Sequence, residues 1–234
     1  MNGLGVAAVA VGAAAAVQVG PAGTWLPGLR RVLTPPLCGP MPAGTVALTF
    51  DDGPHPEGTI AILDELERLG WPATFFVLGS EVRRHPDVLV ETLRRGHRVG
   101  VHGYEHRYTI ARTPWGIASD LRRGRDAVAE VTGQTPRWWR PTYGVMSGPS
   151  YAAARSLGLR PVLWSAWGKD WLAAASPESV VAELESGRLA SGTMLLHDSD
   201  ITSAPGSWRT TLAALPLLAE RLAERELAVA AFGG

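Results

Sequence analysis

The chain has 234 residues, of which 46% are hydrophobic and 19% are charged, so it can bury a sizeable core and is not a disordered chain. Lys plus Arg and Asp plus Glu both number 22, giving zero formal net charge. This balance argues against a nucleic-acid partner, which usually requires a basic excess. The single cysteine, Cys38, excludes an internal disulfide.

The first 40 residues differ in composition from the rest of the chain. Residues 3–20 carry no charge and are mostly Ala, Val and Gly. A signal peptide, a weak membrane anchor or a helix packed on the domain could have this composition, and we interpret the run as an anchor or export signal. Residues 21–42 are rich in Pro and Gly, which is typical of a linker or wrap-around segment. The catalytic domain is predicted to cover residues 41–234.

From residue 45 onward, short apolar runs alternate with segments of helical periodicity. The predicted strands cover residues 46–50, 74–78, 98–101, 137–140, 160–164, 193–196 and 227–231. The predicted helices cover residues 59–70, 86–95, 115–131, 149–157, 177–186 and 210–225. This alternation predicts an α/β fold: a distorted or incomplete (β/α) barrel of about seven parallel strands with helices outside.

Potentially reactive side chains follow the predicted strands rather than being scattered. Asp51 and Asp52 follow the first strand and His102 the third; Arg140 ends the fourth. Asp170 lies a few residues past the fifth strand, and His197 follows the sixth. The carboxyl ends of parallel barrel strands lie on one face, where active sites form. We therefore expect these residues to share one site.

Two adjacent carboxylates, Asp51 and Asp52, occur in the sequence Thr-Phe-Asp-Asp-Gly-Pro at residues 49–54. Neighbouring side chains at a strand end point in different directions, so one carboxylate can bind a metal while the other acts as a base. Asp-Gly and Gly-Pro are also common turn dipeptides, and a simple turn is the alternative interpretation.

A pair of histidines, His102 and His106, is spaced so that both can reach one metal from a single turn of chain. Glu105 between them does not match the zincin pattern, in which Glu directly follows the first His. Two histidines and one carboxylate leave coordination positions open, which is typical of catalytic sites. The mixed donors suit Zn²⁺ and also Co²⁺, Ni²⁺ or Mn²⁺. His97, in a predicted turn, is interpreted as structural.

Taken in order, five motifs resemble those of the polysaccharide deacetylase family, also called the NodB-homology domain or carbohydrate esterase family four. The resemblance runs from about residue 46 to the C-terminus. The motifs are Thr49-Phe50-Asp51-Asp52-Gly53, His102-Gly103-Tyr104-Glu105-His106, Arg140-Pro141-Thr142-Tyr143-Gly144, Asp170-Trp171 and Leu195-Leu196-His197. Three positions depart from the family pattern without removing an expected ligand, base or acid: Gly103, Thr142 and Trp167.

The resemblance implies a role for each matched residue. The implied metal ligands, most often for zinc, are Asp52, His102 and His106. The implied catalytic residues are the base Asp51, the acid His197, and Arg140 and Asp170, which orient them. The implied substrate contacts are Tyr143, through its backbone N–H, Trp171 and Leu195. Flat aromatic faces stack on sugar rings, so five tryptophans near the motifs are candidates to line the site, with core filling as the alternative: Trp138, Trp139, Trp164, Trp167 and Trp171.

The resemblance therefore implies a metal-dependent hydrolase of non-peptide carbon–nitrogen bonds that deacetylates N-acetylated sugars of a chitin-like or peptidoglycan-like polysaccharide. A related hydrolase of a small amide or cyclic imide is one alternative. A non-catalytic carbohydrate-binding relative is another, although the expected base, acid and ligands are all present. Such a substrate places the protein in the cell envelope or outside the cell, with weak membrane association through residues 3–20. Arg30 and Arg31, which follow that run, would instead favour a cytoplasmic domain by the positive-inside rule.

Overall fold

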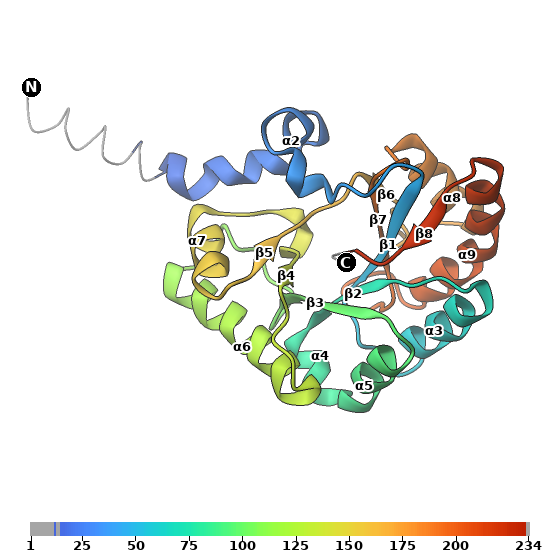
Figure 1. Cartoon of the computed structure of the whole chain (residues 1–234). Helices are drawn as coiled ribbons and strands as arrows, with labels where there is room; N and C mark the ends of the chain where they lie inside the picture. The colour runs from blue at the N-terminus through green and yellow to red at the C-terminus, as the bar shows by residue number, and fades with distance from the viewer. Residues whose placement is uncertain (1–11, 13–14, 233–234) are drawn as a thin grey trace, which may run out of the picture.

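The computed structural model describes residue 12 and residues 15–232. A parallel sheet forms its centre, with neighbouring strands in the order β5-β4-β3-β2-β1-β7-β6, and β8 pairs with the first half of β1. The strands are β1 (Thr45–Asp51), β2 (Thr74–Leu78), β3 (Arg98–Gly103), β4 (Trp138–Trp139), β5 (Arg160–Pro161), β6 (Ala166–Trp167), β7 (Thr193–His197) and β8 (Ala228–Ala230). The sheet curls into a half-barrel, which confirms the predicted distorted barrel (Figure 1).

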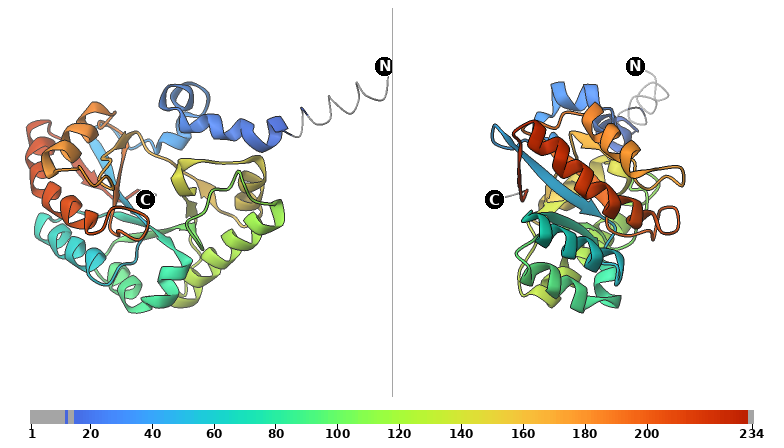
Figure 2. Two further views of the ribbon diagram at one scale, coloured as in Figure 1. Left: turned by 180° about the vertical axis from the view of Figure 1, so that it is seen from behind. Right: turned by 90° about the vertical axis from the view of Figure 1, so that its right-hand side faces the viewer.

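Helices cover the outer face of the sheet, as Figure 2 shows from behind and from the side. They are α3 (Gly58–Leu69), α4 (Gly79–Arg84), α5 (Pro86–Arg94), α6 (Pro114–Thr132), α7 (Gly148–Ser156), α8 (Pro177–Ser186) and α9 (Ser207–Glu224). Two of them start at capping boxes: Ser147 and Ser176 each accept a hydrogen bond from the backbone N–H three residues later. These local signals explain why the helix starts were close to those predicted.

Strand β1 lies in the middle of the sheet and is buried on both faces. Its residues Val46, Leu48 and Phe50 belong to the main core beneath the outer helices. Because side chains alternate along a strand, Thr49 and Asp51 point into the barrel interior. The same alternation therefore builds the core on one face and delivers polar groups to the other.

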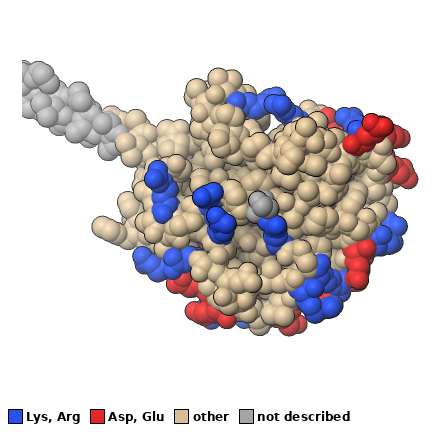
Figure 3. All heavy atoms as spheres, in the orientation of Figure 1, with Lys and Arg blue, Asp and Glu red and all other residues tan. Residues whose placement is uncertain are grey.

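Most charged side chains lie on the molecular surface, apart from a buried minority. Figure 3 shows Lys and Arg spread over the face in view, with Asp and Glu nearer its margins. Many of these charges pair within or between helices, as Arg95 does with Asp64 and Glu91. Such exposed pairs contribute little to stability, so the fold depends mainly on the apolar core.

In the described part of the segment before β1, residues 15–19 are helical and three short helices follow: η1 (Gly20–Trp25), α2 (Pro27–Leu33) and η2 (Pro35–Cys38). This segment packs on the barrel, burying Arg30 and Leu37. A wrap-around segment therefore describes this stretch better than a free linker, and the domain boundary at residue 40 stays a prediction. Of residues 3–20, interpreted as an anchor or export signal, residues 3–11, 13 and 14 lie outside the described part. Among the described residues, no helix combines the length and apolar character needed to span a membrane.

The predicted fifth strand, residues 160–164, is shorter in the structure. Only Arg160 and Pro161 pair with β4, and the chain then leaves the sheet. The Leu163 N–H donates a hydrogen bond to the Leu37 carbonyl of the N-terminal segment at 2.7 Å. Strand β6 resumes beside β7 two residues after Trp164. The N-terminal segment thus bonds to the chain at the point where it leaves the sheet.

Candidate active site

The residues predicted to share one site lie together at the carboxyl ends of the strands. Asp51 and His197 are directly opposed on the neighbouring strands β1 and β7. His102 lies near the end of β3, and Arg140 follows β4. Asp51, His102 and His197 line a cavity of about 400 Å³. These residues therefore lie on one face of the barrel, as expected for the carboxyl ends of parallel strands.

Three side chains converge in this cavity: Asp52, His102 and His106. The Nε2 atoms of the two histidines lie 3.3 and 3.4 Å from Oδ1 of Asp52. One possible ligand atom from each residue lies within 4.8 Å of the other two. Oδ1 of Asp52 is buried and has no hydrogen-bond partner within the described chain. A buried, unpaired carboxylate oxygen facing two imidazole nitrogens fits a divalent metal.

Both histidines are prepared to present a lone pair. Nδ1 of His102 lies 2.9 Å from the carbonyl oxygen of Arg140. A carbonyl only accepts, so Nδ1 carries the proton and Nε2 is left free toward Asp52. Burial lowers the pKa of His106 to about 4, despite the opposing effect of the Asp52 carboxylate. His106 is therefore neutral near pH 7, as a metal ligand must be.

The backbone of Asp52 separates the two adjacent carboxylates. Its φ of 79° lies in the left-handed region, which is uncommon for a non-glycine residue and is concentrated at functional sites. The chain bends here, so the Asp51 side chain turns toward Arg140 while that of Asp52 turns toward the histidines. The Thr202 hydroxyl donates to Oδ2 of Asp52 at 2.5 Å and fixes the carboxylate. The turn that was the alternative interpretation is therefore present, and it directs the Asp52 carboxylate toward the two histidines.

Asp51 is held by a fully buried arginine. Nη1 of Arg140 donates to Oδ1 of Asp51 and to the hydroxyl of Thr49, each at 2.8 Å, and Nη2 donates to the Leu163 carbonyl at 2.9 Å. Burial lowers the pKa of Arg140, and the Asp51 carboxylate opposes this shift. The second oxygen of Asp51 faces the candidate metal ligands, 3.8 Å from Nε2 of His102. Arg140 therefore anchors one oxygen of Asp51, and the other oxygen is directed at the candidate metal ligands.

His197 forms a buried pair with Asp170. Nδ1 of His197 lies 2.8 Å from Oδ1 of Asp170, and Oδ2 accepts from the His197 backbone N–H and the Thr211 hydroxyl, each at 2.7 Å. Burial lowers the pKa of His197, but the charge and hydrogen bond of Asp170 outweigh it and raise the pKa to about 9. The imidazole is therefore protonated at neutral pH, with Nε2–H available to a substrate.

Sequence reasoning missed Asp120 on α6, which supports the loop between the two histidines. Its carboxylate accepts from the backbone N–H of Tyr104 at 3.0 Å and of Glu105 at 3.4 Å, and pairs with Arg112 at 3.0 Å. Asp120 is only 8% exposed. An acidic residue on the buried face of α6, beside Leu121, was the available signal.

We expect Asp120→Ala to lower metal affinity by about 10- to 100-fold, the usual effect of removing a residue that orients a ligand. The loop carrying His106 would lose two charge-assisted hydrogen bonds to its backbone. Isothermal titration with Zn²⁺ measures the effect. Asp126→Ala, on the exposed face of the same helix, is the matched control. Equal affinity in the two variants would show that Asp120 does not position the loop.

Aromatic side chains form one wall of the cavity. Tyr143, with φ of 58°, stacks on Tyr108 with ring centroids 3.7 Å apart, and its ring lies 4.3 Å from that of His106. On the other side, Trp171 stands edge-on to His197 at 5.4 Å. Tyr108, Tyr143 and Trp171 all line the cavity.

Trp171 belongs to a second wall of the cavity, which is apolar. Leu195 packs with Leu163 and Trp164, and Trp167 stacks on Trp171 with centroids 4.7 Å apart. All three residues predicted to contact substrate line the cavity: Tyr143, Trp171 and Leu195. Tyr108 and Trp25 also line it and were not predicted.

Two of the five candidate tryptophans lie elsewhere, so the prediction that they line the site is wrong. Trp139 is 1% exposed and belongs to the main core. Trp138 packs against Phe232 near the start of β4, with ring centroids 4.7 Å apart. Both are strand residues, so neither reaches past the carboxyl end of β4 as Arg140 does.

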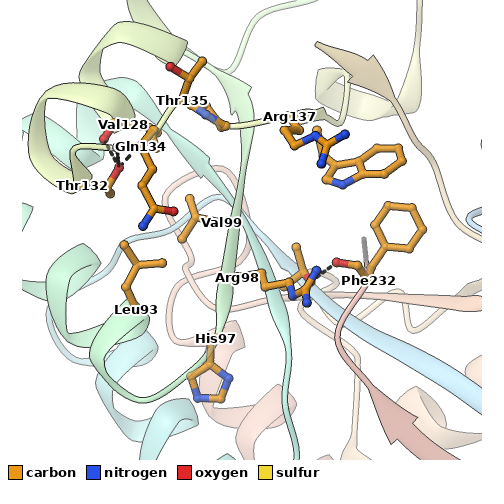
Figure 4. Close-up of a pocket in the computed structure, with 13 residues that line it drawn as sticks. Leu93, His97, Arg98, Val99, Val128, Thr132, Gln134, Thr135, Arg137 and Phe232 are labelled. Atoms are coloured by element: carbon orange, nitrogen blue, oxygen red, sulfur yellow. Dashed lines mark hydrogen bonds between the residues drawn. The ribbon is translucent and has the colours of Figure 1, made fainter. Parts of the chain in front are cut away.

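A second cavity, of about 290 Å³, lies at the amino ends of the strands and is shown in Figure 4. Arg98, Arg137 and Phe232 line it. His97 at its edge accepts a hydrogen bond from the Ala73 N–H, which agrees with a structural role. Among the described residues, the one group of Asp, Glu, His or Cys side chains that could hold a metal is Asp52, His102 and His106, and it lies outside this second cavity.

A curled parallel sheet with a candidate metal centre at the carboxyl ends of its strands forms an α/β half-barrel. Residues 39–162 match the family described as polysaccharide deacetylase. A chitooligosaccharide deacetylase from Rhizobium leguminosarum is 35% identical over 153 residues, 65% of this chain and 71% of the relative. The chain therefore belongs to the polysaccharide deacetylase family.

Other relatives are named as peptidoglycan deacetylases. The peptidoglycan-N-acetylglucosamine deacetylase PgdA of Listeria monocytogenes is 34% identical over 73% of this chain, which spans only 35% of that protein. Among solved structures, a peptidoglycan N-acetylglucosamine deacetylase has a TM-score of 0.74 at 25% identity, covering 82% of this chain and 88% of its own. A family 4 carbohydrate esterase from Streptomyces lividans, in complex with acetate, has a TM-score of 0.70 at 30% identity, covering 80% and 91%.

Proposed function

We propose that this protein is a metal-dependent N-deacetylase that hydrolyses the acetamide carbon–nitrogen bond of N-acetylated sugars in a chitin-like or peptidoglycan-like polysaccharide. One observation carries the proposal: Asp51 and His197 sit on opposed strand ends, beside the Asp52 cluster, in one cavity. The named activities of the relatives, on peptidoglycan and on chitooligosaccharides, support the substrate class.

The first half of the reaction requires a base beside the metal ligands. Asp52, His102 and His106 would hold a divalent ion, most often zinc, which supplies Lewis-acid activation of the amide and of water. Asp51 takes a proton from the attacking water through its unanchored oxygen. Arg140 holds the other oxygen and keeps the carboxylate in position. A new carbon–oxygen bond forms at the acetyl carbon, and the backbone N–H of Tyr143 is placed by the family resemblance to stabilise the oxyanion.

The second half requires an acid. His197 carries a proton at neutral pH and donates it from Nε2 to the departing nitrogen as the carbon–nitrogen bond breaks. Asp170 holds the imidazole and stabilises its positive charge. The products are acetate and a free amino sugar. Leu195 and Trp171 provide an apolar surface for the acetyl methyl group.

The pH dependence of turnover is a direct consequence of this acid. Activity should fall as the pH rises through about 9, because His197 must be protonated to act. Asp170→Asn removes the charge that raises this pKa, so the alkaline limb of the kcat profile should move to lower pH. Profiles of the wild type, Asp170→Asn and the surface control Asp126→Asn measure the shift. An unmoved limb in Asp170→Asn would show that another group titrates there.

Hydrolysis of glycans and of small molecules tests the proposed function. The full chain, reconstituted with Zn²⁺, is assayed for acetate release from N-acetylchitooligosaccharides and peptidoglycan, and for loss of substrate with a small amide and a cyclic imide. We expect acetate from at least one glycan. Turnover of the small amide or imide alone would favour the related C–N hydrolase. Glycan binding without turnover would favour a non-catalytic relative.

A further inference from the structure

The segment before β1 lies outside the part of the chain that matches the family, which begins at residue 39. Figure 1 shows its helices η1 and α2 over the side of the barrel where the edge strands β5 and β6 lie. Its helical part reaches across this side: the Gln18 side chain donates to the Ile110 carbonyl at 3.0 Å, in the loop after β3. The open side of the half-barrel is therefore covered by a segment that lies outside the family match.

A buried arginine fastens this segment beside the candidate site. Arg30 is 2% exposed; its Nη2 donates to the Trp164 carbonyl at 2.8 Å and its Nη1 to the Thr24 carbonyl at 3.0 Å. Its guanidinium also lies 5.4 Å from the centroid of the Trp164 ring. Burying a guanidinium is costly unless it is hydrogen-bonded, so these contacts specify one position for the segment. That position determines where Trp25, the neighbour of Thr24, is placed.

Trp25 extends the wall of the cavity that contains Trp167 and Trp171. Its ring lies 6.5 Å from that of Trp167 at an interplanar angle of 86°. Trp167 in turn stacks on Trp171, which contacts His197. Three indoles thus run from the candidate acid to the mouth of the cavity. Trp25 lines this cavity and is 42% exposed, so part of its ring is accessible to a ligand.

We propose that Trp25 forms a further sugar-binding subsite, which stacks on a pyranose ring of the same glycan chain, beyond the sugar that loses its acetyl group. The inference rests on the proposed function and extends its substrate to an oligosaccharide or polymer. One face of a pyranose presents C–H groups, so an exposed indole held rigidly in place can cover that face at small entropic cost. Residues 20–38 are, on this account, a positioning segment for the subsite.

Binding measurements on an inactive background test the subsite independently of turnover. Calorimetry compares Asp51→Asn with Asp51→Asn/Trp25→Ala, using N-acetylglucosamine and N-acetylchitohexaose as probes. We expect Trp25→Ala to weaken hexamer binding by about tenfold, the worth of one aromatic stacking contact, and to leave the monosaccharide unchanged. Trp25→Phe should restore most of the loss. Trp115→Ala, at an 83% exposed indole that does not line the cavity, is the matched control.

In the otherwise wild-type enzyme, Trp25→Ala should raise KM for the hexamer and leave kcat nearly unchanged. Equal hexamer affinity with and without Trp25, or equal losses for the hexamer and the monosaccharide, would overturn the subsite. A wild type that releases no acetate from any glycan would instead remove the proposed function, and the hexamer affinities would still decide whether Trp25 binds sugar.

Discussion

Replacing His102 or His106 with Ala is expected to remove both the bound metal and the deacetylase activity. Each substitution leaves two of the three ligand atoms that face one another within 4.8 Å, and two donors hold a divalent ion poorly. Lewis-acid activation contributes several kcal/mol to catalysis, so kcat/KM should fall by about 10³-fold or more. The protein should remain folded, because the apolar core rather than the metal site stabilises the barrel.

Elemental analysis, acetate release and thermal unfolding measured on the same preparations check this expectation. His85→Ala, in the short connection between α4 and α5, is the control for loss of a histidine elsewhere. A His102→Ala or His106→Ala protein that keeps a full equivalent of metal would show that the ligand set is misassigned.

Asparagine substitutions should separate the roles of the two adjacent aspartates. Asp51→Asn preserves the acceptor for Arg140, so the metal content should stay near that of the wild type. Turnover should nevertheless fall by about 10²- to 10⁴-fold, the usual worth of a positioned general base. Asp52→Asn replaces the buried, unpaired carboxylate oxygen with a neutral amide oxygen, a poorer metal donor, so metal is lost along with activity.

Metal content and kcat of both variants are measured under the same conditions. Metal lost from Asp51→Asn and kept by Asp52→Asn would reverse the two roles. Normal turnover in Asp51→Asn would remove the proposed base.

The central strands could be predicted because burial on both faces makes them continuous apolar runs, as in Val46 to Phe50. Strand β6 could not, since two residues, Ala166 and Trp167, show no periodicity. Helix α4 was also missed, because six residues next to α5 give no separate helical pattern. Propensity and periodicity therefore identify long elements and fail for those that exist only by pairing with a neighbour.

The candidate site could likewise be predicted only in part. Asp51, Asp52 and His197 could be placed together because each ends a recognisable strand. Trp25 and Asp120 could not, since their positions depend on contacts between distant segments: a buried arginine for one and the packing of α6 on the histidine loop for the other. No local pattern marks a residue whose role is decided by tertiary packing.

Titrating the metal-free protein with Zn²⁺ while acetate release is followed shows whether Asp52, His102 and His106 hold a catalytic metal. The substrate is N-acetylchitohexaose or peptidoglycan, whichever the wild type turns over. We expect no release without metal and a linear rise that saturates at one equivalent of Zn²⁺ per chain, because the described residues offer one Asp–His–His cluster. Full activity in the metal-free protein would rule out a catalytic metal at this cluster, and so would a rise in activity that persists in the His106→Ala variant.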